Sequence, residues 1–208
     1  MGVVYIKRPT ESSMLGLWRL TESVNELFDK LDLSESDNEV YQTKKTDIRR
    51  KEWLAIRNLL ENMLSESTEI RYDENGVPHL TGDKYHISMS HSGEYVCVYL
   101  DRLKKVGIDV QKLKKTIKAG ADFFLNKQEL DWINLDDNEL LHIIWSAKET
   151  IYKYGADREL DMKKDMTTTR FDRNQKGQIE VTISTPGRQE KVSVDYELFE
   201  EYVLAKTS

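Results

Sequence analysis

The sequence predicts an α+β protein made of two similar halves, each a small, mainly antiparallel sheet packed with helices. Helical patterns precede a group of strand patterns within residues 1–104, and this order recurs within residues 105–208. The spacing of apolar residues changes from three or four to two where helix gives way to strand. A chain of 208 residues is also long enough to bury cores in two small domains. No residue-level repeat is visible, so the expected duplication rests on element order.

In the first half, the clearest element is a helix over residues 47–64, where apolar residues recur at spacings of three and four and form one stripe. A shorter helix is expected over residues 22–31. Asn75-Gly76 favours a tight hairpin because both residues tolerate positive φ. Strands are expected over residues 3–6, 69–72, 77–80, 85–89 and 95–100, and a further strand over residues 106–110 lies just past the boundary, in the second half.

In the second half, Asn126 is a good N-cap, and Glu129 three residues later completes a capping box. Asp136 or Asp137 is expected to cap a longer helix that runs to about residue 154, where the next residue, Gly155, is a natural stop. The last third has strand patterns over residues 167–171, 178–184, 191–196 and 201–205.

The net charge of −6 argues against a general nucleic-acid binder. Residues 104–118 depart from this balance, because they hold six lysines and one aspartate, a net of +5. Such a segment is either a solvated, lysine-rich turn or a surface for an anionic ligand or an acidic partner.

The single cysteine, Cys97, excludes an intrachain disulfide and a cysteine-rich zinc site. No apolar run approaches the roughly 18–20 residues of a membrane helix. The N-terminus lacks the basic start and long apolar stretch of a secretory signal. We therefore expect a cytoplasmic protein with no membrane partner and no nucleic-acid partner.

Three short segments carry candidate chemistry. The first ends a buried-looking strand: Asp109 and Gln111 point to the same face because side chains alternate along a strand. A carboxylate in this position is suited to holding a hard cation, although an aspartate there can also cap a turn.

The second segment, residues 145–153, lies on the long helix and pairs Glu149 with Lys153 at a spacing of four. Such a pair is commonly an exposed ion pair. Here, however, the apolar stripe containing Trp145 leads directly into the turn of Glu149, which should bring the acid close to the core.

The third segment, residues 88–93, is predicted to be a turn of small residues between two strands. It would expose backbone N–H groups, hydroxyls and the His91 imidazole together, as phosphate-binding loops do, or it is a hairpin turn with an incidental histidine.

Taken together, these segments resemble the surfactin-type 4′-phosphopantetheinyl transferases. That family has an S-H-S-G loop, then a G-I-D-V/I-E strand end, then a W-S-x-K-E-x-x-x-K helix. In this chain the three motifs are Ser-His-Ser-Gly at 90–93, Gly-Ile-Asp-Val-Gln at 107–111 and Trp-Ser-Ala-Lys-Glu at 145–149 with Lys153. Order and spacing both agree, and the resemblance covers residues 72 to 155.

The resemblance implies a pseudo-twofold fold with the active site in a cleft between residues 1–104 and 105–208. Coenzyme A would lie in that cleft as co-substrate, with Mg²⁺ bridging its pyrophosphate. Asp109 and Glu149 would be metal ligands, and Lys153 would contact the phosphates.

The remaining contacts implied by the resemblance lie in the first half. Ser90 and His91 would contact the 3′-phosphoadenosine end of coenzyme A. An arginine at the start of the first-half helix usually binds phosphate in this family, and Arg49 and Arg50 are both candidates.

The sequence departs from the family pattern at two positions. Gln111 stands where the family often has a second acid, so its carboxamide oxygen would ligate Mg²⁺ directly or through water, with less charge. Val77 stands where the family often has a phosphate-contacting lysine. Lys44, Lys45 and His79 are candidates to replace that contact.

The implied reaction is transfer of 4′-phosphopantetheine from coenzyme A to a serine of an acyl or peptidyl carrier protein, with release of 3′,5′-ADP. Glu149 would act as the base, Asp109 would help hold the metal, and Lys153 would stabilise charge on the phosphates. The carrier would serve fatty acid, polyketide or nonribosomal peptide synthesis. We expect a monomer, because one chain would contain both sides of the cleft.

Two other functions stay open. A Mg²⁺-dependent hydrolase of nucleotide pyrophosphates would use similar carboxylates but would need no protein acceptor. A degenerate module that binds coenzyme A or the carrier, without transfer, would account for Gln111 and Val77.

Overall fold

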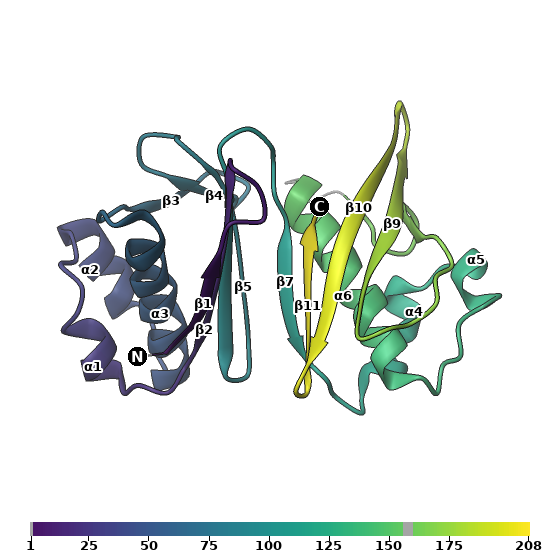
Figure 1. Cartoon of the computed structure of the whole chain (residues 1–208), viewed down its shortest axis with the longest axis horizontal. Helices are drawn as coiled ribbons and strands as arrows, with labels where there is room; N and C mark the ends of the chain where they lie inside the picture. The colour runs from purple at the N-terminus through teal and green to yellow at the C-terminus, as the bar shows by residue number, and fades with distance from the viewer. Residues whose placement is uncertain (1, 156–159) are drawn as a thin grey trace. The chain divides into compact units, whose positions relative to one another are not determined.

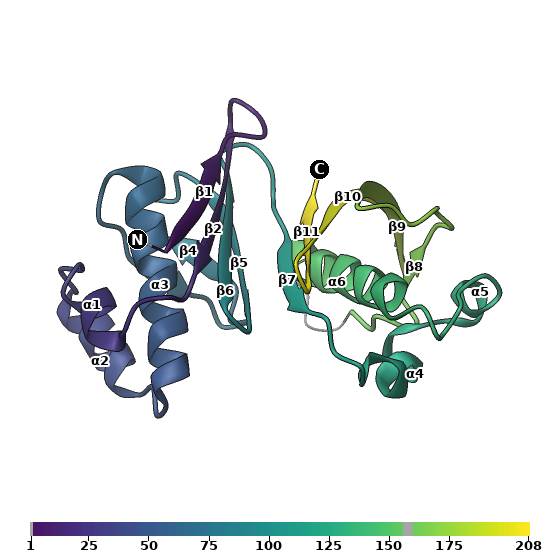
Figure 2. The same cartoon turned by 60° about the horizontal axis from the view of Figure 1, so that its bottom comes forward.

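The computed structural model describes residues 2–155 and 160–208. The chain divides into two compact units, Met1–Lys105 and Val106–Ser208. Figure 1 labels the elements of each unit, and Figure 2 shows the same elements from a second direction. Each unit contains one antiparallel sheet with one long helix packed on a face of it. The expectation of an α+β fold with two similar halves is therefore confirmed.

The first unit has a six-stranded sheet in the order β1-β2-β6-β5-β4-β3, with every pair antiparallel. Its helices lie together on one side of this sheet (Figure 1). The strands are β1 (Val3–Lys7), β2 (Ser13–Arg19), β3 (Ile70–Tyr72), β4 (Pro78–Leu80), β5 (His86–Ser92) and β6 (Tyr95–Asp101). The helices are α1 (Val24–Phe28), α2 (Glu35–Gln42) and α3 (Asp47–Leu64).

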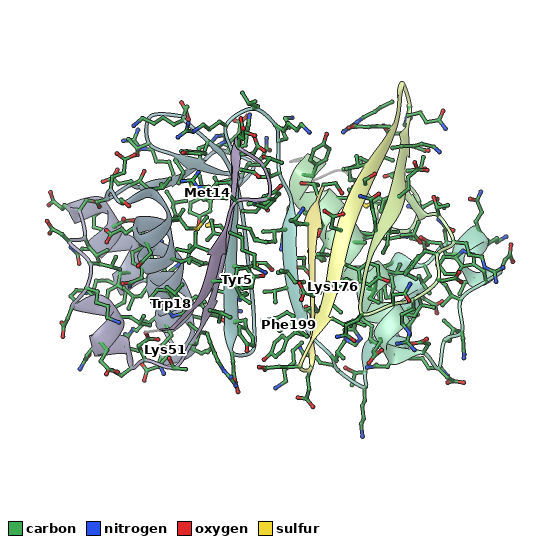
Figure 3. All side chains as sticks on the ribbon, viewed as in Figure 1. Tyr5, Met14, Trp18, Lys51, Lys176 and Phe199 are labelled. Atoms are coloured by element: carbon green, nitrogen blue, oxygen red, sulfur yellow. The ribbon has the colours of Figure 1, made fainter. Side chains whose placement is uncertain are left out.

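Helix α3 organises the core of the first unit. It begins where the Thr46 side chain accepts a hydrogen bond from the backbone N–H of Arg49, and it ends at Ser65 in the left-handed conformation. Its apolar stripe packs against residues of β2, including Met14 and Trp18, whose side chains are labelled in Figure 3. A Cβ on Gly16 of β2 would lie 2.7 Å from the Met63 sulfur, so the strand and helix approach closely because this position has no side chain.

The second unit has a five-stranded sheet in the order β7-β11-β10-β9-β8, again antiparallel throughout. The strands are β7 (Ile108–Lys112), β8 (Met166–Thr168), β9 (Lys176–Thr185), β10 (Arg188–Phe199) and β11 (Tyr202–Thr207). The helices are η1 (Ile117–Gly120), α4 (Ala121–Phe124), α5 (Lys127–Leu130) and α6 (Asn138–Gly155). One side of α6 packs on the sheet, and another packs on α4 and the segment around it.

The helix caps of the second unit agree with the sequence prediction. The Asn126 side chain accepts from the Glu129 N–H, and the Glu129 carboxylate accepts from the Asn126 N–H, which is a complete capping box. The Asp137 carboxylate accepts from the backbone N–H of Leu140, so Asp137 rather than Asp136 caps α6.

Two elements of the first unit were missed. Strand β2 is buried on both faces along almost its whole length, so its residues do not alternate between apolar and polar. Helix α2 is short and mostly polar, so it has no apolar stripe to predict it. Across the described residues, no helix combines the length and the apolar content needed to span a bilayer.

The prediction of a turn over residues 88–93 was wrong for most of that segment. Ser88 to Ser92 continue strand β5 and pair with β6, with Ser90 opposite Cys97 and His91 opposite Val96. Only Gly93, at φ 56°, takes the turn conformation. The backbone of the Ser-His-Ser segment belongs to the sheet ladder, so it does not form a phosphate-binding loop.

Candidate functional site

Two clusters of polar side chains hold the residues singled out from the sequence, one in each unit. In the second unit, β7 and α6 together carry Asp109, Gln111, Glu149 and Lys153, which we call the acidic cluster. Gly107 allows these elements to meet: a Cβ there would lie 2.0 Å from the backbone oxygen of Thr150. The glycine of the Gly-Ile-Asp motif is therefore required by close packing of β7 on α6.

Asp109 and Lys153 form the best-defined contact of the acidic cluster. The Lys153 Nζ donates to Asp109 Oδ1 at 2.9 Å and to the backbone oxygen of Ile108 at 3.0 Å. Asp109 is 4% exposed, so its charge is compensated inside the protein rather than by water.

Glu149 lies one turn before Lys153 on α6 and is half-buried. Burial raises the pKa of the Glu149 carboxyl, the negative charge of Asp109 raises it further, and Lys153 partly opposes both effects. Two carboxylates thus interact unfavourably beside one lysine, and an added cation would relieve their repulsion.

The oxygen donors of the acidic cluster fit a hard divalent cation such as Mg²⁺. Asp109 and Glu149 supply carboxylates, while Gln111 supplies a carboxamide whose nitrogen donates to the backbone oxygen of Lys112 at 3.3 Å. Within residues 2–155 and 160–208 there is no group of three or more His, Cys, Asp or Glu side chains able to hold a metal. Water would therefore have to complete the shell, as is usual for Mg²⁺.

Lys148, the residue before Glu149, has a different environment. It is 0% exposed and donates to Glu129 Oε2 at 2.7 Å and to three backbone oxygens, those of Phe124, Met162 and Met166, at 2.5–3.0 Å. The other oxygen of Glu129 accepts from the N–H and hydroxyl of Thr168. Lys148 therefore joins α6 to α5 and β8 inside the second unit and is not available to a ligand.

In the first unit, Arg49, Glu52 and His91 form what we call the Arg49 cluster. Arg49 Nη1 donates to Glu52 Oε2 at 3.0 Å and lies 3.4 Å from His91 Nε2, while His91 Nδ1 lies 3.2 Å from Glu52 Oε1. Burial alone raises the pKa of Glu52, but the hydrogen bond and charge of His91, followed by the charge of Arg49, hold it below its ordinary value. Glu52 is thus ionised and orients both Arg49 and His91.

A pocket of about 580 Å³ opens beside the Arg49 cluster. Lys44, Lys45, Arg49 and His91 contribute basic groups to its wall, and Glu52 contributes a carboxylate. Because Glu52 is already compensated by Arg49 and His91, the lysines leave the pocket with an excess of positive charge. Its wall also includes the aromatic residues Trp53 and Tyr72. The pocket is suited to an anionic ligand with a flat, aromatic part.

Arg49 and Arg50 have different surroundings in the structure, and so do Ser90 and His91. Arg49 lines the pocket, whereas Arg50 Nε donates to the backbone oxygen of Lys44 at 3.1 Å and so supports the loop before α3. His91 lies on the sheet face that packs with α3, and strand alternation places Ser90 on the opposite face, 8% exposed. The predicted contacts of these four residues with coenzyme A stay predictions.

The sequence did not single out Glu52 or Tyr72 as site residues. Glu52 follows Arg49 by three residues on α3, a spacing that would have indicated a pair on one helix face. Of the residues considered as substitutes for a lysine at position 77, Lys44 and Lys45 line the pocket, while His79 lies 3.4 Å from Asp73 Oδ2.

Comparison with known proteins identifies the family. A family model described as the 4′-phosphopantetheinyl transferase superfamily matches residues 105–207, which include the whole acidic cluster. The chain belongs to the 4′-phosphopantetheinyl transferase superfamily. The resemblance noted in the sequence motifs is thereby confirmed at the level of the superfamily.

Curated proteins similar to this chain are also named as 4′-phosphopantetheinyl transferases. It is 31% identical over 113 residues to the 4′-phosphopantetheinyl transferase AcpT of Salmonella typhi, covering 51% of the chain and 59% of the relative, with the same values for AcpT of Salmonella typhimurium. It is 28% identical over 93 residues to a putative 4′-phosphopantetheinyl transferase of Haemophilus influenzae, covering 41% of the chain and 40% of the relative. The match thus spans less than two thirds of the length of each relative.

Proposed function

We propose that this protein transfers the 4′-phosphopantetheine group of coenzyme A to a serine of an acyl or peptidyl carrier protein, as a holo-carrier-protein synthase does. The observation that carries the proposal is the acidic cluster: two carboxylates and a lysine held together on β7 and α6, within the region that matches the superfamily. This set offers what the reaction needs, namely a base, a cation site and a positive charge for phosphate oxygens.

In this proposal the serine hydroxyl attacks the β-phosphorus of coenzyme A, and the bond from that phosphorus to the bridging oxygen breaks. The serine proton passes to the Glu149 carboxylate, whose raised pKa favours taking it. The leaving group is 3′,5′-ADP. Lys153 donates to phosphate oxygens as negative charge shifts onto the leaving group.

Asp109, Glu149 and Gln111 are the proposed Mg²⁺ ligands. When bound there, Mg²⁺ would neutralise the pyrophosphate oxygens of coenzyme A. When the substrate binds, Lys153 would give up part of its contact with Asp109 and would contact phosphate oxygens instead.

The pocket beside the Arg49 cluster is the proposed site of the 3′-phosphoadenosine end. Arg49, Lys44 and Lys45 would contact phosphate, His91 would assist, and Tyr72 would stack on the base. We further propose that the acidic cluster and this pocket bind the same coenzyme A molecule. Ser90 stays a candidate contact of coenzyme A. Arg50 also stays a candidate, and it supports the loop that carries Lys44.

The test is to incubate the protein with coenzyme A, Mg²⁺ and apo carrier proteins from fatty acid, polyketide and peptide synthesis, and to record intact masses with and without EDTA. A metal-dependent gain of one phosphopantetheine on any carrier supports the proposal, and the ranking of carriers identifies the pathway. Cleavage of coenzyme A without an acceptor would instead indicate a pyrophosphate hydrolase. Binding of coenzyme A without either reaction would indicate a degenerate binding module.

The variant Glu149→Gln tests the proposed base. It keeps the size of the side chain but removes the proton acceptor, so we expect kcat to fall by roughly 100-fold or more while the far-ultraviolet circular dichroism stays unchanged. Activity close to that of the wild type would rule out Glu149 as the base.

The proposal also includes a monomeric, cytoplasmic enzyme without membrane or nucleic-acid partners. Light scattering coupled to size-exclusion chromatography tests the monomer, and a stable dimer at micromolar concentration would contradict it.

A further inference from the structure

Helix α2 of the first unit is attached to α3 in an unusual way. A surface helix usually packs on its domain through a stripe of apolar residues. Of the residues of α2, all of which lie in the described part of the chain, only Asp37 is buried, at 8% exposed. Its Oδ1 accepts from Nη2 of Arg57 on α3 at 2.7 Å, and Arg57 is 4% exposed. A buried ion pair is therefore the main buried contact that α2 contributes.

The Asp37–Arg57 pair is poorly suited to the sole purpose of stabilising the fold. Both charges lose water on burial, and their attraction offsets this loss only where the hydrogen bonds are complete. Among the described residues, Arg57 Nε is buried and has no hydrogen-bond partner. Apolar residues of similar volume would hold the two helices together at least as well. What the pair adds is direction, because a charge-assisted hydrogen bond fixes the orientation of α2 on α3.

Helix α2 leads directly into the pocket beside the Arg49 cluster. Thr43, Lys44 and Lys45 follow its last residue and line that pocket. The Lys44 backbone N–H donates to the backbone oxygen of Tyr41 at 3.0 Å, and the Lys44 backbone oxygen accepts from Arg50 Nε at 3.1 Å. The positions of the two lysines are therefore tied to the position of α2.

Arg57 also contacts another part of the same pocket wall. Its guanidinium carbon lies 3.3 Å from the centroid of the Trp53 ring, which is a close cation–π contact. Trp53 lines the pocket, and its ring centroid lies 5.9 Å from that of Tyr41 on α2. Desolvation raises the pKa of Tyr72, a further lining residue, while the charge of Arg57 lowers it and that of Asp37 raises it. The ion pair is thus close to the lysine loop, to Trp53 and to Tyr72.

We propose that Asp37 and Arg57 are positioning residues of the coenzyme A pocket. Their ion pair holds Lys44, Lys45 and the Trp53 ring in the arrangement that receives the anionic end of the ligand. This inference rests on the proposed function, which assigns that pocket to coenzyme A. It makes a specific claim: the pair supplies orientation, so a variant that keeps the stability of the fold still loses affinity for the ligand.

The test measures binding of 3′,5′-ADP, the leaving group of the proposed reaction, to the intact chain by isothermal titration calorimetry. Arg57→Met removes one partner and leaves the Asp37 charge buried. The double variant Asp37→Leu/Arg57→Met replaces the pair by an apolar contact, so it keeps the attachment of α2 but loses its direction. Arg19→Met is the matched control, because Arg19 pairs with Glu94 at 2.8 Å and lies over the Tyr95 ring, but is partly exposed.

We expect the Kd for 3′,5′-ADP to rise by about tenfold in Arg57→Met and by about fivefold in the double variant, as for loss of a group that supports a ligand site. The urea midpoint should fall in Arg57→Met and return close to that of the wild type in the double variant, because no uncompensated charge is left buried. The Kd of Arg19→Met should stay within about twofold of wild type.

Transfer kinetics provide a second readout. The KM for coenzyme A should rise with the Kd, while kcat stays within about twofold of wild type, because the acidic cluster belongs to the other unit. If Arg57→Met does not fold, Arg57→Lys takes its place. It keeps the charge but not the planar contact with Trp53, and it should raise the Kd by about threefold.

The inference fails if the double variant regains the affinity of the wild type together with its stability, because the pair would then serve the fold alone. It also fails if Arg57→Met or Arg57→Lys binds 3′,5′-ADP as tightly as the wild type, or if kcat falls while the Kd is unchanged. A wild type that binds 3′,5′-ADP but modifies no carrier gives a different result. It rejects the proposed transfer, and the Kd values of the variants still decide the role of the pair. A wild type that does not bind 3′,5′-ADP overturns this inference and the assignment of the pocket together.

Discussion

Replacement of the buried Lys148 by methionine tests how the acidic cluster is supported. Lys148 and Glu129 are both 0% exposed and 2.7 Å apart, and three backbone oxygens also accept from the lysine. Burial lowers the pKa of Lys148, and the charge of Glu129 opposes that shift. The ammonium group is therefore retained by its partners and not by solvent.

The expected loss of folding stability follows from the contacts that remain around Glu129 in Lys148→Met. Methionine fills most of the volume, so the cavity is small. Glu129 keeps hydrogen bonds from Thr168 and Asn126 but loses its cationic contact with Lys148, at zero exposure. Removing one partner of a buried pair costs about 3–5 kcal/mol. This is a large part of the roughly 5–15 kcal/mol that stabilises a typical domain.

The assay is urea unfolding at pH 7, followed by circular dichroism for wild type, Lys148→Met, and the double variant Glu129→Gln/Lys148→Met. The double variant removes the uncompensated charge, so we expect it to recover at least about 1 kcal/mol relative to the single variant. Lys127→Met, at an exposed position of α5, is the matched control and should change stability by less than about 0.5 kcal/mol. A loss below about 1 kcal/mol in Lys148→Met, or a double variant no more stable than the single one, would refute the reasoning.

Three further predictions concern the two clusters and His142 of α6, whose Nε2 accepts from the backbone N–H of Lys114. Arg49→Gln should raise the KM for coenzyme A by about tenfold, whereas Lys51→Gln on the same helix should not, as initial rates will show. Gly107→Ala should destabilise the second unit by about 1–3 kcal/mol in urea unfolding, because its Cβ would meet the Thr150 oxygen, and a smaller loss would mean that β7 shifts freely. Burial lowers the pKa of His142, so the unfolded chain binds this proton more readily and stability should fall as the pH drops below about 6.5. His142→Gln should lessen that fall between pH 7 and 5, and identical pH profiles for both proteins would contradict this role of His142.

The local pattern of residues in the sequence determined much of the secondary structure and the family motifs of this protein. Helix α3 was predicted to the residue from its apolar stripe, and the structure adds its cap at Thr46. The capping box at Asn126 and Glu129 could be predicted because its hydrogen bonds join residues three apart in sequence. The three motifs indicated the superfamily because each keeps a fixed residue order within a few positions.

Tertiary structure decided the rest, because the deciding contacts join residues far apart in sequence. Strand β2 has no alternating pattern because both of its faces are buried. The Ser-His-Ser segment has small, turn-like residues, yet pairing with β6 makes it a strand. Local spacing also treats Lys148 and Lys153 alike, as basic residues on one helix.

Packing gives those two lysines different partners. Lys148 faces a buried glutamate from α5, and Lys153 faces Asp109 from β7. The sequence alone thus determined most of the helices and strands and the family motifs. Only the folded chain decided which charged side chains are fully buried and which stay partly exposed, because desolvation and long-range partners set the energy of a charge.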